Sequence, residues 1–475
     1  MVACLASDSD DTPREPPSPE ATTSTADGGD SGEPTTPPEG LLAGNSMELA
    51  IDEAFFPCYL SFWAHGDDVW PATPGHDFEF SPVLSLPPPF PDQHPSLAII
   101  IAELQTHHNT LIHADKTYTD RFGLDLANHI FTPSNLETFI TAYFNLIHPD
   151  FPFTHRPSFN LATCPPPLLL AFFLAGAMRI PHKVSLRTIS RLAEEYTFAH
   201  LSTFLISAHN PSPDLIPALQ AAVLVHCSQY ATHCATTRRR NRVTRLPILV
   251  SAIRSLGFTS LRHSDTQPSF GEFIRTETAL RIAVYTVLAD WHQSGMFLVP
   301  ALTTIYEMTG GFPCLPELWE ADSPEAFQRV VETLGTGCWD RGASVREGVE
   351  ALMGEGAFRF PLRDVTVYDL HLLVYASHAV VRGALLMGLL PASSGTLLRA
   401  AERWQGLWDG VVKGMGEEGA RRCGLARHSP ELAWLMRRMI DGKTDERLVR
   451  SRYLAGVAHD GLDELYSLIK IFKDL

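Results

Sequence analysis

Apolar residues recur at helical spacing in most of the chain after residue 96, and the segment SNLETFITAYFNLI shows the pattern most clearly. Its apolar positions are three and four residues apart, so one face of a helix is apolar and is predicted to be buried. Ser134 and Glu137 predict a capping box at the start of this helix. Pro149 predicts its end, because a proline disfavours helical geometry in the residue before it. The buried stripe consists of Leu136, Phe139, Ile140, Tyr143, Phe144 and Ile147.

The same periodicity recurs downstream in segments that Pro, Gly or Ser residues separate. No convincing run of alternating apolar and polar residues predicts a sheet, and the sequence shows no fixed repeat period. The pattern therefore predicts an all-α fold of many helices that pack by ridges and grooves. The expected helices cover residues 167–180, 185–207, 214–234, 243–256, 271–294, 367–390, 394–415, 429–440 and 448–472.

Charge divides the chain into two unequal parts. Residues 1–115 contain nineteen acidic residues and one basic residue, Arg14, whereas residues 116–475 contain thirty-five acidic and thirty-six basic residues. The first part repels nucleic acid and anionic membranes, so contact with DNA is expected from elsewhere. The longest apolar run, residues 168–178, is too short to span a bilayer. Since no secretory signal and no dense cysteine cluster is visible, we expect an intracellular protein with reduced thiols.

The acidic part contains two kinds of segment. Residues 1–46 are rich in Ser, Thr, Pro, Gly, Asp and Glu and are predicted to be disordered. Residues 47–92 combine nine aromatic and eight acidic residues with no Lys or Arg, which is typical of an acidic activation segment. The alternative is a linker whose aromatic residues pack on the folded part. The candidate activation residues are Phe55, Phe56, Phe62, Trp63 and Trp70.

The segment YFNLIHPDFPFTHRPSF contains His148 and His155 and raises the question of a metal or catalytic site. Its three prolines oppose helix and strand, so the chain is expected to be extended, with the two histidines up to roughly 23 Å apart. No cysteine or carboxylate pair lies at ligand spacing beside them. We therefore predict a structural corner whose phenylalanines fill the core. The residues assigned to this role are His148, Pro149, Phe151, Pro152, His155, Pro157 and Phe159.

A second cluster, HCSQYATHC, contains His226, Cys227, His233 and Cys234. Donors seven residues apart on a straight helix are separated by about 10.5 Å along its axis, whereas zinc ligands lie about 2.0–2.3 Å from the ion. A shared ion would need a break in the helix, so no metal site is predicted. The sequence also lacks a Gly-rich phosphate loop, a nucleophile elbow and an HExxH motif. We predict no catalytic, cofactor-binding or metal-binding residue and no enzyme activity.

The basic run RRRNRVTR has three interpretations: a nuclear-import patch, a phosphate-contacting patch, or a solvated loop with the first turn of a helix. Further along the chain, Glu277 and Arg281 are four residues apart, and we expect an exposed helix pair worth a few tenths of a kcal/mol. The import candidates are Arg238, Arg239, Arg240, Arg242 and Arg245.

Several segments resemble, in order and spacing, the fungal-specific transcription factor domain, also called the middle homology region. LETFITAYFNLIHPDFPFTHRPSFNLATCPPPLLLAFFLAGA resembles its opening, and LIPALQAAVLVHCSQY and LPILVSAIRSLGF are similar to later helices. The stretch from GEFIRTETALR to LPELWEADSPEAF is similar to the part that follows. GLARHSPELAWLMRRMI is similar to a segment of members with N-terminal zinc fingers of the two-cysteine, two-histidine type.

The chain departs from the family pattern in two places. Phe270 and Phe273 stand where the family usually has tryptophans, and Arg281 lacks the usual neighbouring arginines. The acidic N-terminal part contains neither a six-cysteine cluster nor a zinc finger. The resemblance therefore implies that zinc and DNA are bound only through a module absent from this chain.

The resemblance implies a regulator of RNA polymerase II genes in the fungal nucleus, acting as an activator or a repressor of a metabolic or biosynthetic gene set. Residues 96–327 would form the regulatory domain and residues 328–475 a helical extension packing on it, after a disordered segment at residues 1–95. Its partners would be the transcription machinery or coactivators and a second copy of the chain, with no membrane. The alternatives are a metal- or ligand-binding helical sensor or enzyme, and a helical scaffold, neither with a role in transcription.

Overall fold

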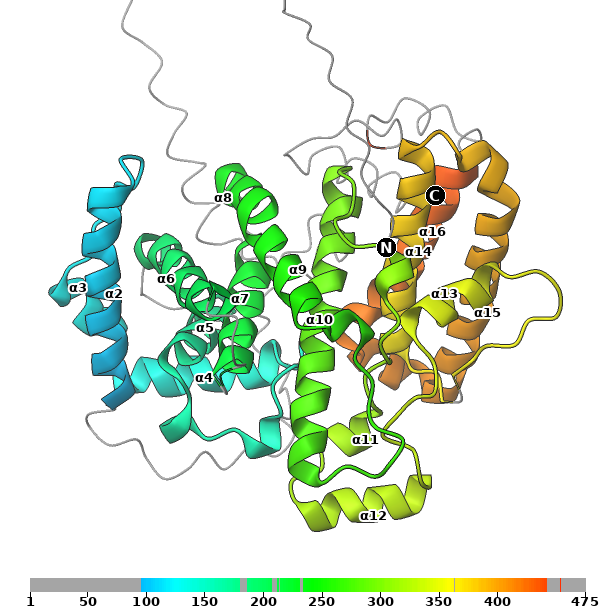
Figure 1. The fold of residues 1–475 in the computed structure, drawn as a ribbon, viewed down its shortest axis with the longest axis horizontal. Coiled ribbons are helices and arrows are strands. Elements are labelled where there is room, and N and C mark those ends of the chain that lie inside the picture. Colours follow the sequence, from blue (N-terminus) through cyan, green and yellow to red (C-terminus); the bar gives the residue numbers. More distant parts are fainter. Residues whose placement is uncertain are drawn as a thin grey trace, which may run out of the picture. The chain divides into compact units, whose positions relative to one another are not determined.

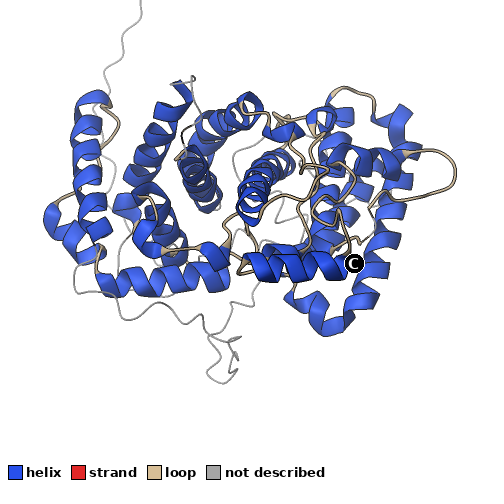
Figure 2. Cartoon of the chain, turned by 60° about the horizontal axis from the view of Figure 1, so that its bottom comes forward, coloured by secondary structure: helices blue, strands red, loops and turns tan. Residues whose placement is uncertain are grey.

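The computed structural model describes residues 95–441 except 180–185, 207–211, 213, 231–233 and 363, and it also describes Tyr453. Every regular element in this part of the chain is a helix, apart from an isolated bridge between Gly311 and Ser344 (Figures 1 and 2). The all-α prediction is therefore confirmed. Among the described helices, none combines the length and the hydropathy needed to cross a membrane.

The first half contains α2 (Pro95–Ala114), α3 (Leu124–Ile130), α4 (Pro133–Leu146), α5 (Pro166–Ala177), α6 (Arg187–Ile206), α7 (Leu215–Tyr230), α8 (Ala235–Arg240), α9 (Leu246–Ser255) and α10 (Phe270–Phe297). The second half contains α11 (Pro316–Trp319), α12 (Pro324–Leu334), α13 (Val345–Met353), α14 (Val367–Leu386), α15 (Leu390–Arg422) and α16 (Ser429–Asp441). Short 3-10 helices include η1 (Arg156–Ser158) and η6 (Gly424–His428), and η3 (Asn241–Arg245) is a π-helix.

The predicted helices agree with the observed ones within a few residues for most boundaries. The largest difference is α15, which extends beyond the predicted range at both ends and is interrupted at Gly416, where φ is 72°. Positive φ favours glycine, because a side chain would clash with the backbone there. The predicted helix at residues 448–472 lies outside the described residues.

The predicted start of α4 is wrong. Its N-cap is Thr132, whose side chain accepts a hydrogen bond from the backbone N–H of Asn135, while Ser134 lies inside the first turn. Pro133 explains the shift, because proline suits the first helical position and keeps the residue before it extended. The predicted stripe is correct, since all six of its residues are buried.

Helices α4 and α5 pack closely because of a glycine. A Cβ atom on Gly176 of α5 would lie 1.8 Å from the backbone oxygen of Phe139 in α4. Any larger residue at this position would therefore force the two helices apart. The segment that contains His148 and His155 connects these two closely packed helices.

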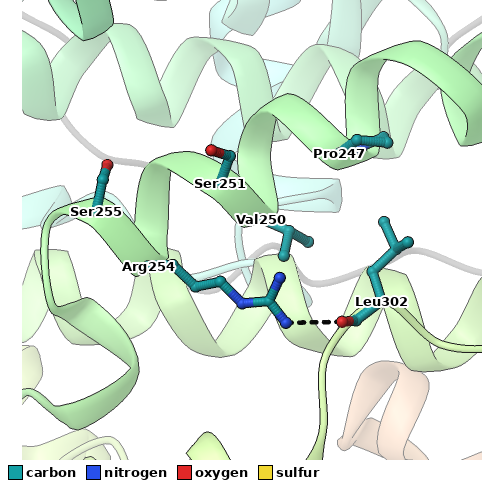
Figure 3. A pocket seen from close by; sticks show the side chains of 6 residues that line it. All are labelled: Pro247, Val250, Ser251, Arg254, Ser255 and Leu302. Atoms are coloured by element: carbon teal, nitrogen blue, oxygen red, sulfur yellow. Dashed lines mark hydrogen bonds between the residues drawn. The ribbon is translucent and has the colours of Figure 1, made fainter. Parts of the chain in front are cut away.

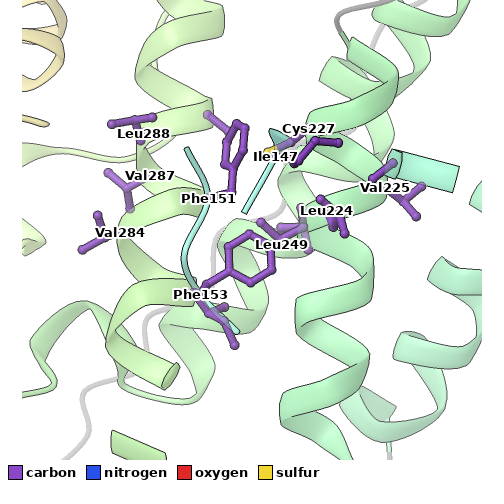
Figure 4. Close-up of a cluster of buried hydrophobic side chains, with 14 of the residues drawn as sticks. Ile147, Phe151, Phe153, Leu224, Val225, Cys227, Leu249, Val284, Val287 and Leu288 are labelled. Carbon is purple, nitrogen blue, oxygen red and sulfur yellow. The ribbon is translucent and has the colours of Figure 1, made fainter. Parts of the chain in front are cut away.

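Helix α10 connects the two halves of the described chain. It packs against α7 and α9 on the N-terminal side and against α14 on the C-terminal side. Figure 4 shows Phe151 and Phe153 among apolar side chains such as Leu224 of α7 and Val287 of α10. The corner between α4 and α5 thus helps to fill the core beside α10.

The C-terminal helices share this core. Helix α14 packs against α10, α15 and α16, and residues of all four helices belong to one buried hydrophobic cluster. Asp150 provides a polar link between the halves, because its Oδ1 accepts a hydrogen bond of 3.0 Å from the backbone N–H of Leu425 in η6. Gly424 is needed at this contact, since a Cβ atom there would meet Asp150 Oδ1 at 2.1 Å.

Candidate functional site

The two histidines of the corner are buried and point to different partners. His148 Nε2 donates a hydrogen bond of 2.6 Å to the carbonyl oxygen of Thr154. His155 Nε2 donates one of 3.1 Å to Ala321 O, and its Nδ1 accepts from the backbone N–H of Ser158. Burial lowers the pKa of both histidines to about 4, so both are neutral at physiological pH. This arrangement favours the structural interpretation that the sequence suggested.

The prolines and phenylalanines of the corner have structural contacts of their own. Phe151 is buried against the ring of Tyr285 on α10, and the half-buried Phe159 packs against Phe144. Pro157 lies in the first turn of η1, where its missing N–H costs nothing. Pro149 lies in the turn after α4, and Pro152 is the residue whose carbonyl binds a buried arginine.

That arginine is Arg281, and its pairing with Glu277 is not the exposed helix pair that the sequence predicted. Glu277 is fully buried and Arg281 is 5% exposed. Arg281 Nε donates a hydrogen bond of 2.6 Å to Glu277 Oε1. The spacing of four residues is as predicted, but the pair faces the protein interior rather than solvent.

The remaining donors and acceptors of this pair come from distant parts of the chain. Arg281 Nη1 donates to Pro152 O (3.1 Å) and Nη2 donates to Cys314 O (3.3 Å), while the guanidinium lies 4.4 Å from the ring centre of Trp319. Glu277 accepts from the backbone N–H of Cys314 (2.9 Å), and its Oε2 lies 2.8 Å from His263 Nε2. We call Glu277, Arg281, His263, Cys314 and Trp319 the buried ionic cluster.

The electrostatics of the buried ionic cluster are those of a satisfied ion pair. Burial alone would raise the pKa of Glu277, but the charge of Arg281 and the hydrogen bonds from His263 and Cys314 lower it to about 2. Burial also opposes the charge of Arg281, yet Glu277 raises its pKa overall. Both groups are therefore charged throughout the physiological range. The cluster ties the corner, α10 and the segment before α11 together.

Phe270 and Phe273, which stand where the family usually has tryptophans, lie next to this cluster. Phe273 is buried with its ring 4.7 Å from that of Phe327 in α12. Phe270 lies 5.8 Å from His155 and 5.7 Å from Phe327. The two phenylalanines join α10 to the small second apolar cluster around Trp319.

The basic run is largely built into the helices, and only part of it agrees with the expected solvated loop. Glu194 of α6 is fully buried and accepts hydrogen bonds from Arg240 Nε (2.8 Å) and Arg245 Nε (2.7 Å). Burial would raise the pKa of Glu194, but these two arginines lower it overall. Arg238 is also buried, whereas Arg239 is exposed. Arg242 lies 5.0 Å from the ring centre of Phe297.

The residues of the HCSQYATHC segment are separated by the fold. His226 is buried in α7, where Gln293 Nε2 donates a hydrogen bond of 2.7 Å to its Nε2. Burial raises the pKa of the Cys227 thiol to about 12. Cys234 is exposed at the start of α8, and His233 lies outside the described residues. Within the described part of the chain, no three His, Cys, Asp or Glu side chains are arranged to hold a metal ion.

A hollow of about 490 Å³ lies between α9 and Leu302 (Figure 3). Its ionisable side chain is Arg254, which donates to Leu302 O (2.7 Å) and to both carboxylate oxygens of Glu307 (2.6 and 2.8 Å). The guanidinium is therefore committed to structural contacts. The lining residues are Pro247, Val250, Ser251, Arg254, Ser255 and Leu302.

Sequence reasoning missed the partners that make these sites, chiefly His263, Cys314 and Glu194. His263 and Cys314 lie 14 and 37 positions from Glu277, and Glu194 lies 51 positions from Arg245. The candidate activation residues cannot be compared, since Phe55, Phe56, Phe62, Trp63 and Trp70 lie outside the described residues.

Comparison with known proteins assigns the region around the buried ionic cluster to a family. Residues 140–339 match the model of the fungal specific transcription factor domain. This match confirms, for residues 140–339, the resemblance seen in the sequence.

Two curated relatives carry names that fit this family. The chain is 31% identical over 181 residues to Transcription factor verF of Penicillium polonicum, over 35% of this chain and 25% of that protein. It is 24% identical over 220 residues to the Nicotinate catabolism cluster-specific transcription factor of Emericella nidulans, over 43% of this chain and 24% of that protein. The match thus spans about a quarter of the length of each relative. No solved structure matches the chain.

Proposed function

We propose that this chain regulates transcription of RNA polymerase II genes in a fungal nucleus. The observation that carries the proposal is the fungal specific transcription factor domain at residues 140–339, and the names of both relatives support it. The helical part would act by binding and by conformational control rather than by bond chemistry. The buried ionic cluster suits this role, because it holds the corner, α10 and the segment before α11 in one fixed arrangement.

Residues 47–92 are proposed to contact the transcription machinery or coactivators. Their nine aromatic and eight acidic residues are the basis for this assignment. When fused to a foreign DNA-binding domain, the segment should activate a reporter gene. Replacing Phe55, Phe56, Phe62 and Trp63 with Ala should abolish that output. Residues 1–46 are a matched control, since they are acidic but contain no aromatic residue. An inactive wild-type fusion would reject the assignment.

The regulated genes are proposed to form a metabolic or biosynthetic set. The name of one relative, a cluster-specific factor of nicotinate catabolism, motivates this proposal. Deleting the gene for this chain should lower the transcripts of a small group of neighbouring metabolic genes. Transcript profiling of the deletion strain and of a complemented strain provides the test. Changes scattered over unrelated genes would contradict it.

Nuclear entry is proposed to use the basic run, in which Arg239 is the most exposed of the five arginines. Replacing Arg238, Arg239 and Arg240 with Ala should shift a fluorescent fusion toward the cytoplasm. These changes also remove a partner of Glu194, so Glu194→Gln is the matched control for lost structure. Unchanged nuclear accumulation of the triple variant would contradict the proposal, as would an equal shift in the control.

We propose that the described helices do not read a DNA sequence, and that a zinc-binding module of the kind found in the family would do so instead. Readers of the major groove need base-contacting side chains backed by several cations that neutralise phosphates. Residues 15–115 contain no Lys or Arg, and two arginines of the basic run are engaged by Glu194. In an anisotropy titration against random duplexes at physiological salt, the purified chain should bind weakly and without sequence preference. Selection of a defined sequence at nanomolar protein would overturn this assignment.

A further inference from the structure

Arg382 of α14 is a buried cation with few polar contacts. It is 2% exposed and lies between α16 and Tyr453. Its Nη2 lies 3.9 Å from the thioether sulfur of Met439, and sulfur is a weak acceptor. Its Nε and Nη1 have no acceptor within hydrogen-bond distance among the described residues. No described carboxylate forms an ion pair with this guanidinium.

A buried arginine without an anion is unfavourable, because a charge loses its hydration on burial and regains energy only from close partners. Burial accordingly lowers the pKa of Arg382, although charge and hydrogen-bond interactions with Tyr453 partly offset the effect. His378 lies one turn earlier on α14 and donates a hydrogen bond of 2.9 Å to Leu432 O. Burial lowers the pKa of His378 to about 4, so it adds no second positive charge at neutral pH.

Tyr453 covers Arg382 and also contacts α10. Its ring centre lies 5.6 Å from the guanidinium carbon, and its hydroxyl donates a hydrogen bond of 2.6 Å to Gly295 O in the last turn of α10. Tyr453 is 1% exposed. The surroundings of Arg382 therefore accept an aromatic ring with a polar group beside the guanidinium.

We propose that Arg382 anchors a binding site for a small aromatic carboxylate, and that the side chain of Tyr453 occupies this site until the ligand displaces it. An aryl ring reproduces the packing of Tyr453 against the guanidinium and the thioether of Met439. A carboxylate adds the negative charge that Tyr453 lacks, and its two oxygens match the paired N–H groups of arginine. Binding would release Tyr453 from α10. The inference goes beyond the proposed role in transcription and does not depend on it.

The first test uses sodium benzoate as the probe and benzamide as the neutral probe of the same shape. Thermal unfolding of the full chain is measured with each probe at constant ionic strength. Benzoate at ten times its dissociation constant should raise the midpoint by roughly 1–2 °C, whereas benzamide should have little effect. Arg382→Met should abolish the benzoate shift. Arg437→Met is the matched control, because Arg437 of α16 is a more exposed arginine paired with Glu402.

The second test follows Tyr453. Tyr453→Ala removes the competing ring, so benzoate should bind about tenfold more tightly to this variant. In the wild-type chain, benzoate should speed tryptic cleavage after Arg452, since Tyr453 leaves its position between Arg382 and Gly295. If Arg382→Met does not fold, Arg382→Lys keeps the charge but loses the paired N–H groups and should bind benzoate more weakly. An equal response to benzamide, or no gain in Tyr453→Ala, would overturn the proposal.

Discussion

Two buried arginines of this protein have opposite surroundings. Arg281 on α10 and Arg382 on α14 are 5% and 2% exposed, and each lies near one aromatic ring, Trp319 or Tyr453. Arg281 is paired with a buried carboxylate and two backbone carbonyls. Arg382 has no carboxylate partner among the described residues. Burial alone therefore does not tell whether an arginine stabilises a fold, because the partners decide it.

The two arginines also differ in their place along the chain. Arg281 lies within residues 140–339, which match the model of the fungal specific transcription factor domain. Arg382 lies outside that match, on helices that pack against the same core. The satisfied ion pair thus lies within the region that matches the family model, and the unsatisfied cation lies outside it. Changing each arginine in the same way tests this difference directly.

The largest effect is expected for Arg281→Met. This change leaves Glu277 buried without its cation, and breaking a buried pair in this way costs about 3–5 kcal/mol of the free energy of unfolding. Denaturant unfolding of the purified chain measures the loss. Arg254→Met is the control, since the exposed pair of Arg254 with Glu307 should contribute no more than about 1 kcal/mol. Equal losses in both variants would mean that burial of the Glu277 pair is not decisive.

The next effect is a loss of stability in acid that comes from histidines and not from the ion pair. The pKa of His148 is about 4 in the folded chain and lies near its usual 6.5 when unfolded. The unfolded state therefore binds more protons between pH 6.5 and 4, so stability falls as the pH is lowered through this window, by about 3 kcal/mol for His148. The pKa of Glu277 is about 2, so its pair with Arg281 persists there.

The control for this acid effect is His148→Gln, which cannot take up a proton. Its unfolding free energy should depend less on pH between 6.5 and 4 than that of the wild type. His155, His292 and His371 also have lowered pKa values because of burial, so part of the dependence should remain. A pH dependence unchanged by His148→Gln would show that His148 is not neutral in the folded chain.

A smaller effect of opposite sign is expected for Arg382→Met. Methionine fills a similar volume and removes a charge that lacks a carboxylate, so the unfolding free energy should rise by about 1–2 kcal/mol. The same denaturant measurement detects it, with Arg437→Met as the surface control. A loss comparable with that of Arg281→Met would show that Arg382 has an anionic partner in the folded protein, and the contrast between the two arginines would disappear.

The sequence predicted the helices and the contacts between residues close in sequence, but not the contacts between residues distant in sequence. Helix α10 follows from its apolar periodicity, and the prolines after α4 explain why the corner is neither helix nor strand. The spacing of Glu277 and Arg281 correctly predicted that they meet. It did not predict burial, because a spacing of four fixes the neighbours on a helix but not which face the rest of the chain covers.

The basic run shows the same limit. Five arginines in eight residues suggested a patch open to solvent or to phosphates, but Glu194 lies about fifty positions earlier and binds Arg240 and Arg245. Nothing in the local sequence marks Glu194 as their partner. Likewise, Thr132 displaced the predicted cap because Pro133 fixes the first turn of α4. Contacts between distant elements, together with competing local signals, account for these errors.

The smallest effect is expected for His155→Gln, which tests whether the corner is structural. The glutamine amide can still donate to Ala321 O, but the edge-on contact of the ring with Trp319, at 4.9 Å between centres, is lost. Trp319 also stacks on Arg281, so the change probes the border of the buried ionic cluster without removing a member. The unfolding free energy should fall by about 1 kcal/mol. Elemental analysis should find no bound metal in the wild type or the variant. A stoichiometric metal lost on substitution would mean that His155 is a ligand and would replace the structural interpretation of the corner.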